Sequence, residues 1–175
     1  MTRSQLVICG LGGQGIIFLT RVVAEAAMHE GSEVLAAETH GMSQRGGAVQ
    51  SCIKVGGYSG SLVRRGRADA ALVLDASRLD AARSFLRADA SCFVDAAAPL
   101  DGTLGCDASG IARELEHPRG ANLVLLGFAA ATKPGLFPGR GALLDTLTRL
   151  SPPAACDENR RALEHGASLA GGVHG

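Results

Sequence analysis

QLVICGLGGQGI, residues 5–16, is the stretch that decides the fold of this chain. It starts with a short apolar run typical of a buried strand, and a glycine cluster follows over Gly10–Gly15. Apolar residues then recur at helical spacing from Ile16 to His29. A second strand is predicted over Glu33–Glu38. This strand–loop–helix–strand order predicts an α/β protein in which helices cover a parallel sheet.

The next segment departs from simple alternation. Thr39–Gly47 is a polar, glycine-bearing loop that stands where a second crossover helix would be expected. Ala48–Val55 alternates like a strand exposed on one face, and Gly56-Gly57 favours a turn after it. Ser61–Arg64 is then expected to pair back as a hairpin. The sheet is therefore expected to be mixed, although mostly parallel.

The remainder of the chain returns to alternating strands and helices. The expected strands are Ala70–Asp75 and Ser91–Asp95, and the expected helices are Ser77–Arg87 (with Ser77 as N-cap), Asn122–Thr132, Leu143–Leu150 and Asp157–Leu169. No internal repeat or linker divides them. We therefore expect one three-layer, Rossmann-like domain over residues 1–170, with a mixed, mostly parallel sheet, helices on both faces and a flexible tail over 171–175.

Composition narrows the range of partners and cofactors. The 175 residues include 17 basic and 17 acidic side chains, so there is no bulk attraction to nucleic acid or to an anionic membrane. No apolar run approaches the length of a membrane span. The five cysteines form no CxxC pair, which predicts neither zinc nor an iron–sulfur cluster on this chain. Their odd number, without a signal peptide, predicts a reducing cytoplasm.

The glycine cluster matches the pattern G-x-G-x-x-G between a strand and a helix. Missing side chains allow a sharp turn there, and the unpaired N–H groups of the first helical turn can face an anion. Two other interpretations stay open. The glycines can simply let the helix pack closely on its strand, or Glu38 can complete a dinucleotide site by binding a ribose. The candidate ligand-binding residues are Gly10, Gly12, Gly13, Gln14 and Gly15.

A second candidate loop, HGMSQRGG at His40–Gly47, directly follows the second strand. Loops after parallel strands gather at one edge of an α/β sheet, so we expect this loop beside the glycine turn. Arg45 can pair there with a phosphate or carboxylate, or with a partner chain. No catalytic residue is assigned, because no third group orients a Ser/His pair. The candidate residues are Ser43, Gln44, Arg45, Gly46 and Gly47.

Together, GLGGQGI at Gly10–Ile16 and HGMSQRGG at His40–Gly47 resemble the gamma domain of 2-oxoacid:ferredoxin (or flavodoxin) oxidoreductases. The stretch RADAALVLD at Arg67–Asp75 also fits. Near the end of the chain, the segment 159–166 is similar to the family's asparagine–aliphatic–glycine pattern. The resemblance covers almost the whole chain. The form of the second loop is most similar to the small (beta) subunit of indolepyruvate oxidoreductases.

The resemblance implies a division of labour. In this family, thiamine diphosphate and iron–sulfur clusters serve the oxidative decarboxylation of a 2-oxoacid to an acyl-coenzyme A, with ferredoxin as the electron acceptor. The chain has no G-D-G thiamine motif and no cluster ligands. The resemblance therefore implies that these cofactors belong to a larger catalytic subunit. It also implies that the glycine turn and the Arg45 loop face coenzyme A or that subunit.

Two other functional classes remain open at this point. The chain can be a free-standing nucleotide-binding, Rossmann-like protein, which tight NAD binding by the isolated chain would indicate. It can also be a purely structural subunit, in which case a complex with both loops mutated would still work. Without its partner, the chain is expected to form a homodimer through exposed apolar surface. Which 2-oxoacid is used lies outside what these residues determine.

Overall fold

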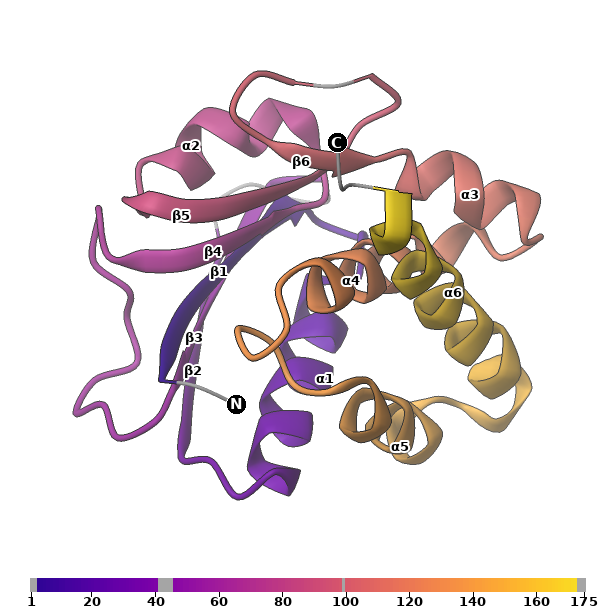
Figure 1. Ribbon diagram of the computed structural model, residues 1–175, viewed down its shortest axis with the longest axis horizontal. Coiled ribbons are helices and arrows are strands. Elements are labelled where there is room, and N and C mark those ends of the chain that lie inside the picture. The colour runs from indigo at the N-terminus through magenta and orange to yellow at the C-terminus, as the bar shows by residue number, and fades with distance from the viewer. Residues whose placement is uncertain (1–2, 41–45, 99, 173–175) are drawn as a thin grey trace.

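A computed structural model describes residues 3–40, 46–98 and 100–172. Within these ranges, six strands form one sheet in the order β2-β3-β1-β4-β5-β6 (Figure 1). The strands are β1 (Ser4–Leu11), β2 (Val34–His40), β3 (Ala48–Val55), β4 (Ala68–Val73), β5 (Leu86–Asp95) and β6 (Leu104–Cys106). The helices are α1 (Ile16–His29), α2 (Leu79–Arg83), α3 (Ala108–Glu114), α4 (Ala121–Thr132), α5 (Arg140–Leu150) and α6 (Cys156–Ser168). Short 3-10 turns are η1 (Ala76–Arg78), η2 (Pro118–Gly120), η3 (Pro153–Ala155) and η4 (Leu169–Gly172).

The sheet is mixed and mostly parallel, as predicted. β1 lies inside it, pairing in parallel with β4 and antiparallel with β3. β4, β5 and β6 continue in parallel, whereas β3 is antiparallel to β2 as well. Because β3 opposes both of its neighbours, β1 and β2 run in the same direction. The carboxyl ends of β1, β2, β4 and β5 therefore lie along one edge of the sheet.

The hairpin predicted over Ser61–Arg64 is wrong. Residues 56–67 cross to the next strand without forming a strand themselves, and Val63 is buried against the sheet. Gly56 and Gly57 do form the expected turn, with φ of 92° and 66°. The physical reason for the error is that β3 already pairs along both of its edges, with β1 and with β2. No edge of β3 is left for a returning strand.

The helix predicted over Ser77–Arg87 is also wrong in its bounds and its cap. Asp75 is the cap, because its Oδ1 accepts from the backbone N of Ser77 at 3.0 Å. α2 ends at Arg83, and the carbonyl of Phe85 then accepts from the N–H groups of residues 67 and 68. This pairing with the start of β4 draws Leu86 into β5. β6 and α3 were not predicted at all.

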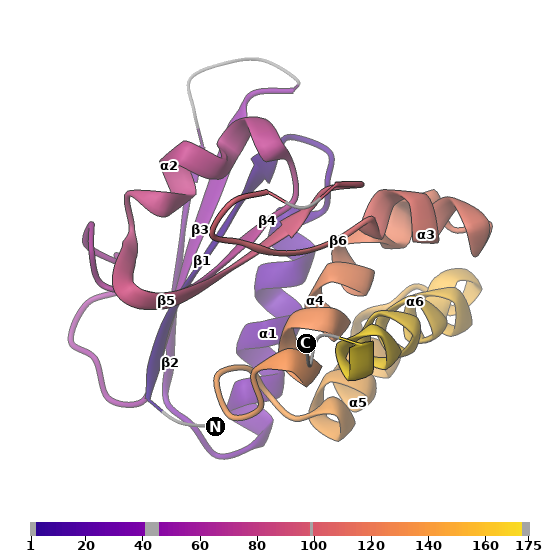
Figure 2. The ribbon, with the colours of Figure 1, turned by 45° about the horizontal axis from the view of Figure 1, so that its top comes forward.

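Helices cover both faces of the sheet, but unequally (Figures 1 and 2). One face packs against α1, α3, α4, α5 and α6 in the larger core, where Phe93 of β5 meets Phe128 of α4 edge to face with centroids 6.0 Å apart. The opposite face is covered by the short α2 and by Val63. The three-layer α/β architecture is thus confirmed. The proposed tail over 171–175 and the domain bounds stay predictions.

α4 and α6 cross closely at two glycines. A β-carbon on Gly127 would overlap the carbonyl oxygen of Leu163, and one on Gly166 would overlap the carbonyl oxygen of Val124. The crossing places α4 between the sheet and α6, which explains why its sequence is apolar nearly all round. The helices predicted here are confirmed as α4, α5 and α6. Among the helices of the described ranges, none is long and apolar enough to cross a membrane.

Candidate functional site

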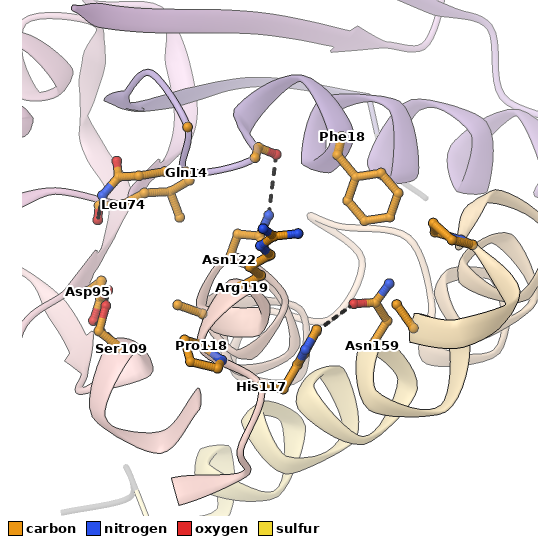
Figure 3. A pocket seen from close by; sticks show the side chains of 15 residues that line it. Gln14, Phe18, Leu74, Asp95, Ser109, His117, Pro118, Arg119, Asn122 and Asn159 are labelled. Atoms are coloured by element: carbon orange, nitrogen blue, oxygen red, sulfur yellow. Dashed lines mark hydrogen bonds between the residues drawn. The ribbon is translucent and has the colours of Figure 1, made fainter. Parts of the chain in front are cut away.

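A cleft of about 480 Å³ opens at the carboxyl edge of the sheet, beside the ends of β1, β4 and β5 (Figure 3). The chain leaves β1 toward β2 on one side and leaves β4 toward β5 on the other. The strand order therefore reverses between β1 and β4, and open α/β sheets bind ligands at such a point. One wall of the cleft is the glycine turn with the start of α1. The other wall comes from α3, η2, α4 and α6.

Gln14 holds the glycine turn in shape. Its Oε1 accepts from the backbone N of Leu11 at 2.7 Å, and its Nε2 donates to the carbonyl of Leu74 at 3.1 Å. One side chain thus joins the turn to the residue after β4. Gly10 makes room for it, since a β-carbon there would lie 2.5 Å from Gln14 Oε1. Both amide atoms of Gln14 are therefore committed to the fold of the turn.

The start of α1 presents open backbone N–H groups. Gly13 and Gly15 have φ of 98° and 75°, which glycine adopts without a steric penalty. Gly15 is the N-cap, no side chain caps the helix, and its first turn contains no acidic residue. Leu19 is the first residue to bond back, to the carbonyl of Gly15 at 2.9 Å. The N–H groups of residues 16–18 have no acceptor within the helix, a geometry that favours a phosphate or carboxylate.

The second loop returns to the glycine turn, as expected. The N–H of Gly12 donates to the carbonyl of Gly47 at 2.9 Å. A β-carbon on Gly12 would lie 3.3 Å from the backbone N of Gly46, so the two backbones approach closely. Ser43, Gln44 and Arg45 lie outside the described residues. Their role, like that of the glycines, stays a prediction.

Glu38 is placed unfavourably for the dinucleotide interpretation. It lies on β2, and β3 stands between β2 and β1. A ribose-binding carboxylate needs to end the strand next to β1, where it can reach a nucleotide on the glycine turn. Glu38 is exposed and does not line the cleft.

Three polar residues form a hydrogen-bonded chain in the opposite wall. Nε2 of His117 lies 2.8 Å from Oδ1 of Asn159, and Nδ2 of Asn159 donates to Oγ of Ser151 at 2.8 Å. Asn159 and Ser151 are buried, and His117 is half-buried. Because the amide oxygen of Asn159 can only accept, this network assigns the proton of a neutral His117 to Nε2. Sequence reasoning missed His117 as a cleft residue.

Asn122 connects the two walls. Its Nδ2 donates to the carbonyl of Gly15 at 3.3 Å, across 107 residues of sequence (Figure 3). Its Oδ1 is buried and has no hydrogen-bond partner within the described residues. A β-carbon on Gly15 would overlap Nδ2 of Asn122, so glycine is needed there for this contact as well as for φ. Asn122 was predicted only as part of a buried helix.

Charged side chains at the cleft are few. Asp95, the last residue of β5, borders the cleft. Both of its carboxylate oxygens are used by Ser109, one by the backbone N at 3.0 Å and one by Oγ at 2.5 Å. Asp75, which follows β4, caps η1 and does not line the cleft. Arg119 of η2 is an exposed cation on the wall opposite the glycine turn.

Two of the cysteine thiols have strongly raised pKa values. Burial raises the pKa of Cys9 to about 12, and burial followed by the charges of Asp95 and Asp107 raises the pKa of Cys106 to about 12. These thiols are therefore protonated at neutral pH and are poor nucleophiles. Within the described residues, no group of three His, Cys, Asp or Glu side chains has the arrangement of a metal site.

Comparison with known proteins gives the same family along most of the chain. Residues 5–169 match the family model of pyruvate ferredoxin/flavodoxin oxidoreductase. The indolepyruvate oxidoreductase subunit IorB of Methanothermobacter thermautotrophicus is 32% identical, covering 94% of this chain and 96% of that protein. The Thermococcus kodakarensis subunit of the same name is 30% identical, covering 97% of both. The crystal structure of the keto/oxoacid ferredoxin oxidoreductase gamma subunit of Geobacter sulfurreducens superposes with a TM-score of 0.81 at 25% identity, covering 98% of this chain and 100% of that one.

Proposed function

The chain belongs to the pyruvate ferredoxin/flavodoxin oxidoreductase family and is a small subunit of a 2-oxoacid:ferredoxin oxidoreductase, and we propose that it binds coenzyme A at the glycine turn, beside a larger catalytic subunit. The observation that carries the coenzyme A assignment is the start of α1, where backbone N–H groups open beside the cleft without an acidic side chain in the first turn. That arrangement favours a diphosphate. Thiamine diphosphate and the iron–sulfur clusters then belong to the larger subunit.

The reaction sets what this subunit must do. The bond between the carboxylate and the carbonyl carbon of the 2-oxoacid breaks, carbon dioxide leaves, and the acyl carbon bonds to the sulfur of coenzyme A. The thiol proton is released, and two electrons go to ferredoxin, a transfer that the clusters would serve when bound to the larger subunit. Thiamine diphosphate, when bound to the partner, supplies the electron sink for decarboxylation. The small subunit holds coenzyme A with its thiol toward the partner.

The candidate residues divide into three groups in this proposal. Gly10 and Gln14 shape the turn, because the room at Gly10 is filled by the Gln14 amide. Gly13 leaves the backbone open to the phosphates, while Gly12 and Gly15 let the turn lie close to Gly46 and Asn122. The second loop adds Arg45 as a partner for a phosphate, with Ser43 and Gln44 as hydrogen-bonding groups and Gly46 and Gly47 as the close backbone that fixes the loop beside Gly12.

Indolepyruvate is the substrate that we propose for the complex. The curated relatives compared above carry that name, and the form of the second loop agrees with it. The carbonyl and the aromatic ring of the substrate would be bound on the larger subunit. The five cysteines of this chain are free thiols, which is in keeping with a place in the reducing cytoplasm. Without its partner, we propose that the chain forms a homodimer.

Anoxic purification of the tagged chain from its native host tests the proposal. We expect a brown complex with a larger chain that holds thiamine diphosphate and iron–sulfur clusters. It should reduce ferredoxin fastest with indolepyruvate, when pyruvate, ketoisovalerate and 2-oxoglutarate are compared. A chain that emerges alone and colourless, from cells that express it normally, would contradict the partner.

A matched pair of arginine variants then separates ligand contact from partner contact. Arg45→Ala should raise the KM for coenzyme A roughly tenfold, because one charge-assisted hydrogen bond is lost, and the complex should keep its stoichiometry. Arg65→Ala is the control, since Arg65 is exposed on the connection after β3, away from the cleft. If Arg45→Ala instead prevents assembly, the loop serves the partner. Unchanged coenzyme A dependence in an intact complex would exclude the ligand role.

A further inference from the structure

One end of the cleft is not used by the phosphate contacts proposed above. Phe18 of α1 lies on one wall of this end, and His117 and Asn159 lie on the other (Figure 3). Phe18 and His117 are each only half-buried, so both side chains keep surface open to the cleft. An aromatic side chain across from an imidazole makes a slot that suits a flat, ring-shaped group.

The backbone before His117 is fixed by an unusual helix end. α3 closes with paired hydrogen bonds, from the N–H of His117 to the carbonyl of Ala112 at 2.9 Å and from Glu116 to Arg113 at 3.0 Å. These are the two bonds of a Schellman motif. In that motif, the first of the two donor residues adopts the left-handed conformation. That residue is Glu116, with φ of 56°, and it is the one non-glycine residue of the described ranges with a positive φ. The fold therefore holds a strained residue directly before His117.

The ring of His117 is fixed as firmly as its backbone. Gly120 leaves space for it, because a β-carbon on Gly120 would overlap Cδ2 of His117 and would lie 3.2 Å from its Nε2. Nε2 is also the atom that meets Asn159. The Cδ2–Nε2 edge of the ring therefore packs against the protein. The opposite edge, with Nδ1, is the one left for the cleft, and in the tautomer set by Asn159 it is a hydrogen-bond acceptor.

We propose that this end of the cleft binds the adenine ring of the nucleotide, flat against Phe18, with Nδ1 of His117 accepting from its exocyclic amine. The inference rests on the function proposed above, because coenzyme A carries its diphosphate on adenosine. The glycine turn then holds the phosphates at one end of the cleft. At the other end, Phe18 stacks on the base and His117 hydrogen-bonds to it. A hypoxanthine ring would place a carbonyl oxygen where the amine stands, and two acceptors would face each other.

Calorimetric titration of the full chain with ADP and with IDP tests the base subsite. These two nucleotides differ in the exocyclic group while sharing the diphosphate. We expect ADP to bind roughly tenfold more tightly than IDP, the size of one lost hydrogen bond with an acceptor left unpaired. His117→Ala should bring that ratio close to one. Phe18→Ala should weaken both nucleotides alike, by roughly tenfold, because stacking does not depend on the exocyclic group.

His165→Ala is the matched control, since His165 is an exposed histidine on α6 and does not line the cleft. It should leave both affinities unchanged. Should His117→Ala fail to fold, the ¹⁵N chemical shift of Nδ1 in the unaltered chain gives the same answer. At saturation, ADP should move it toward the value of a hydrogen-bonded nitrogen, and IDP should not.

Competition with coenzyme A separates this inference from the proposed function. If ADP binds with the expected preference and coenzyme A does not displace it, the base subsite stands and the coenzyme A assignment falls. If coenzyme A binds but ADP and IDP bind equally, or His117→Ala keeps their ratio, the base subsite is overturned and the coenzyme A assignment stands. If no nucleotide binds to the chain or to its complex, both are overturned.

Discussion

The two walls of the cleft are built in different ways. The wall with the glycine turn is mainly backbone, and Gln14 holds it by bonding to Leu11 three positions earlier and to Leu74 after β4. The opposite wall is mainly side chains, and its central hydrogen bond joins His117 to Asn159 across 42 residues. The first wall depends mainly on the backbone conformation of its glycines. The second depends on how α3, α4 and α6 are packed.

This difference predicts how each wall fails. A change in the glycine turn should alter ligand binding through backbone strain, while the helices stay packed. A change at the α4–α6 crossing should move the whole second wall. Asn122 belongs to α4, Asn159 belongs to α6, and η2 leads directly into α4. Substitutions that break the packing should therefore cost more stability than substitutions that break the turn.

Gly166→Ala should have the largest effect. Its β-carbon would overlap the carbonyl oxygen of Val124, which is backbone and cannot rotate away, so α6 must move off α4. We expect the free energy of unfolding to fall by about 3 kcal/mol, at the upper end for overpacking. Urea denaturation followed by circular dichroism measures it.

Gly141→Ala is the control for that substitution. Gly141 lies in α5, and a β-carbon there would meet nothing within 4 Å. Alanine should stabilise this helix by about 0.5–1 kcal/mol. If both variants lost stability equally, the loss at Gly166 would not come from the helix crossing.

Gly15→Ala should have the next largest effect and should act on the other wall. Alanine at φ of 75° is strained, and its β-carbon would overlap Nδ2 of Asn122. We expect a loss of about 2 kcal/mol in the free energy of unfolding. Gly13→Ala separates the two causes, because Gly13 has φ of 98° and nothing within 4 Å of a β-carbon. A loss at Gly13 as large as that at Gly15 would mean that the contact with Asn122 contributes nothing.

The walls also differ in how many of their helices and strands could be predicted from the sequence. α1 was predicted with the bounds that it has, Ile16–His29, because helical periodicity and the glycines before it are local signals. α3 and β6 were missed, since one has seven residues and the other three, too few for periodicity to be recognised. α2 was predicted too long. The hydrogen bond from the N–H of Ala68 to the carbonyl of Phe85 draws the chain into β5 and overrides the local helical preference.

The same reasoning explains which site residues could be predicted. Gly12 and Gly47 were expected to be close because the loops follow strands that end at one edge, and this is confirmed. His117 carries no local signal of its place. Asn159 and Gly166 were noticed only as part of a family pattern. The structure gives that pattern a physical basis, since Asn159 orients His117 and Gly166 allows the α4–α6 crossing.

Asn159→Ala should have an intermediate effect, confined to the second wall. It leaves Nε2 of His117 and Oγ of the buried Ser151 without their partner. We expect a loss of about 1.5 kcal/mol in the free energy of unfolding. In NMR spectra, the His117 ring should lose its single tautomer. Arg161→Ala, an exposed change on the same helix, is the control and should alter neither quantity.

Glu116→Gly should have the smallest effect, with the opposite sign. Glycine relieves the strain of a φ of 56°, worth about 1–2 kcal/mol, while it adds freedom to the unfolded chain, so a net gain of about 0.5 kcal/mol is expected. The helix end should stay intact, because its two hydrogen bonds use backbone atoms. If the strained residue is kept because it fixes His117, the stabilised variant should bind ADP less tightly. A variant that gains stability and keeps full ADP affinity would show that Glu116 has no part in positioning the imidazole.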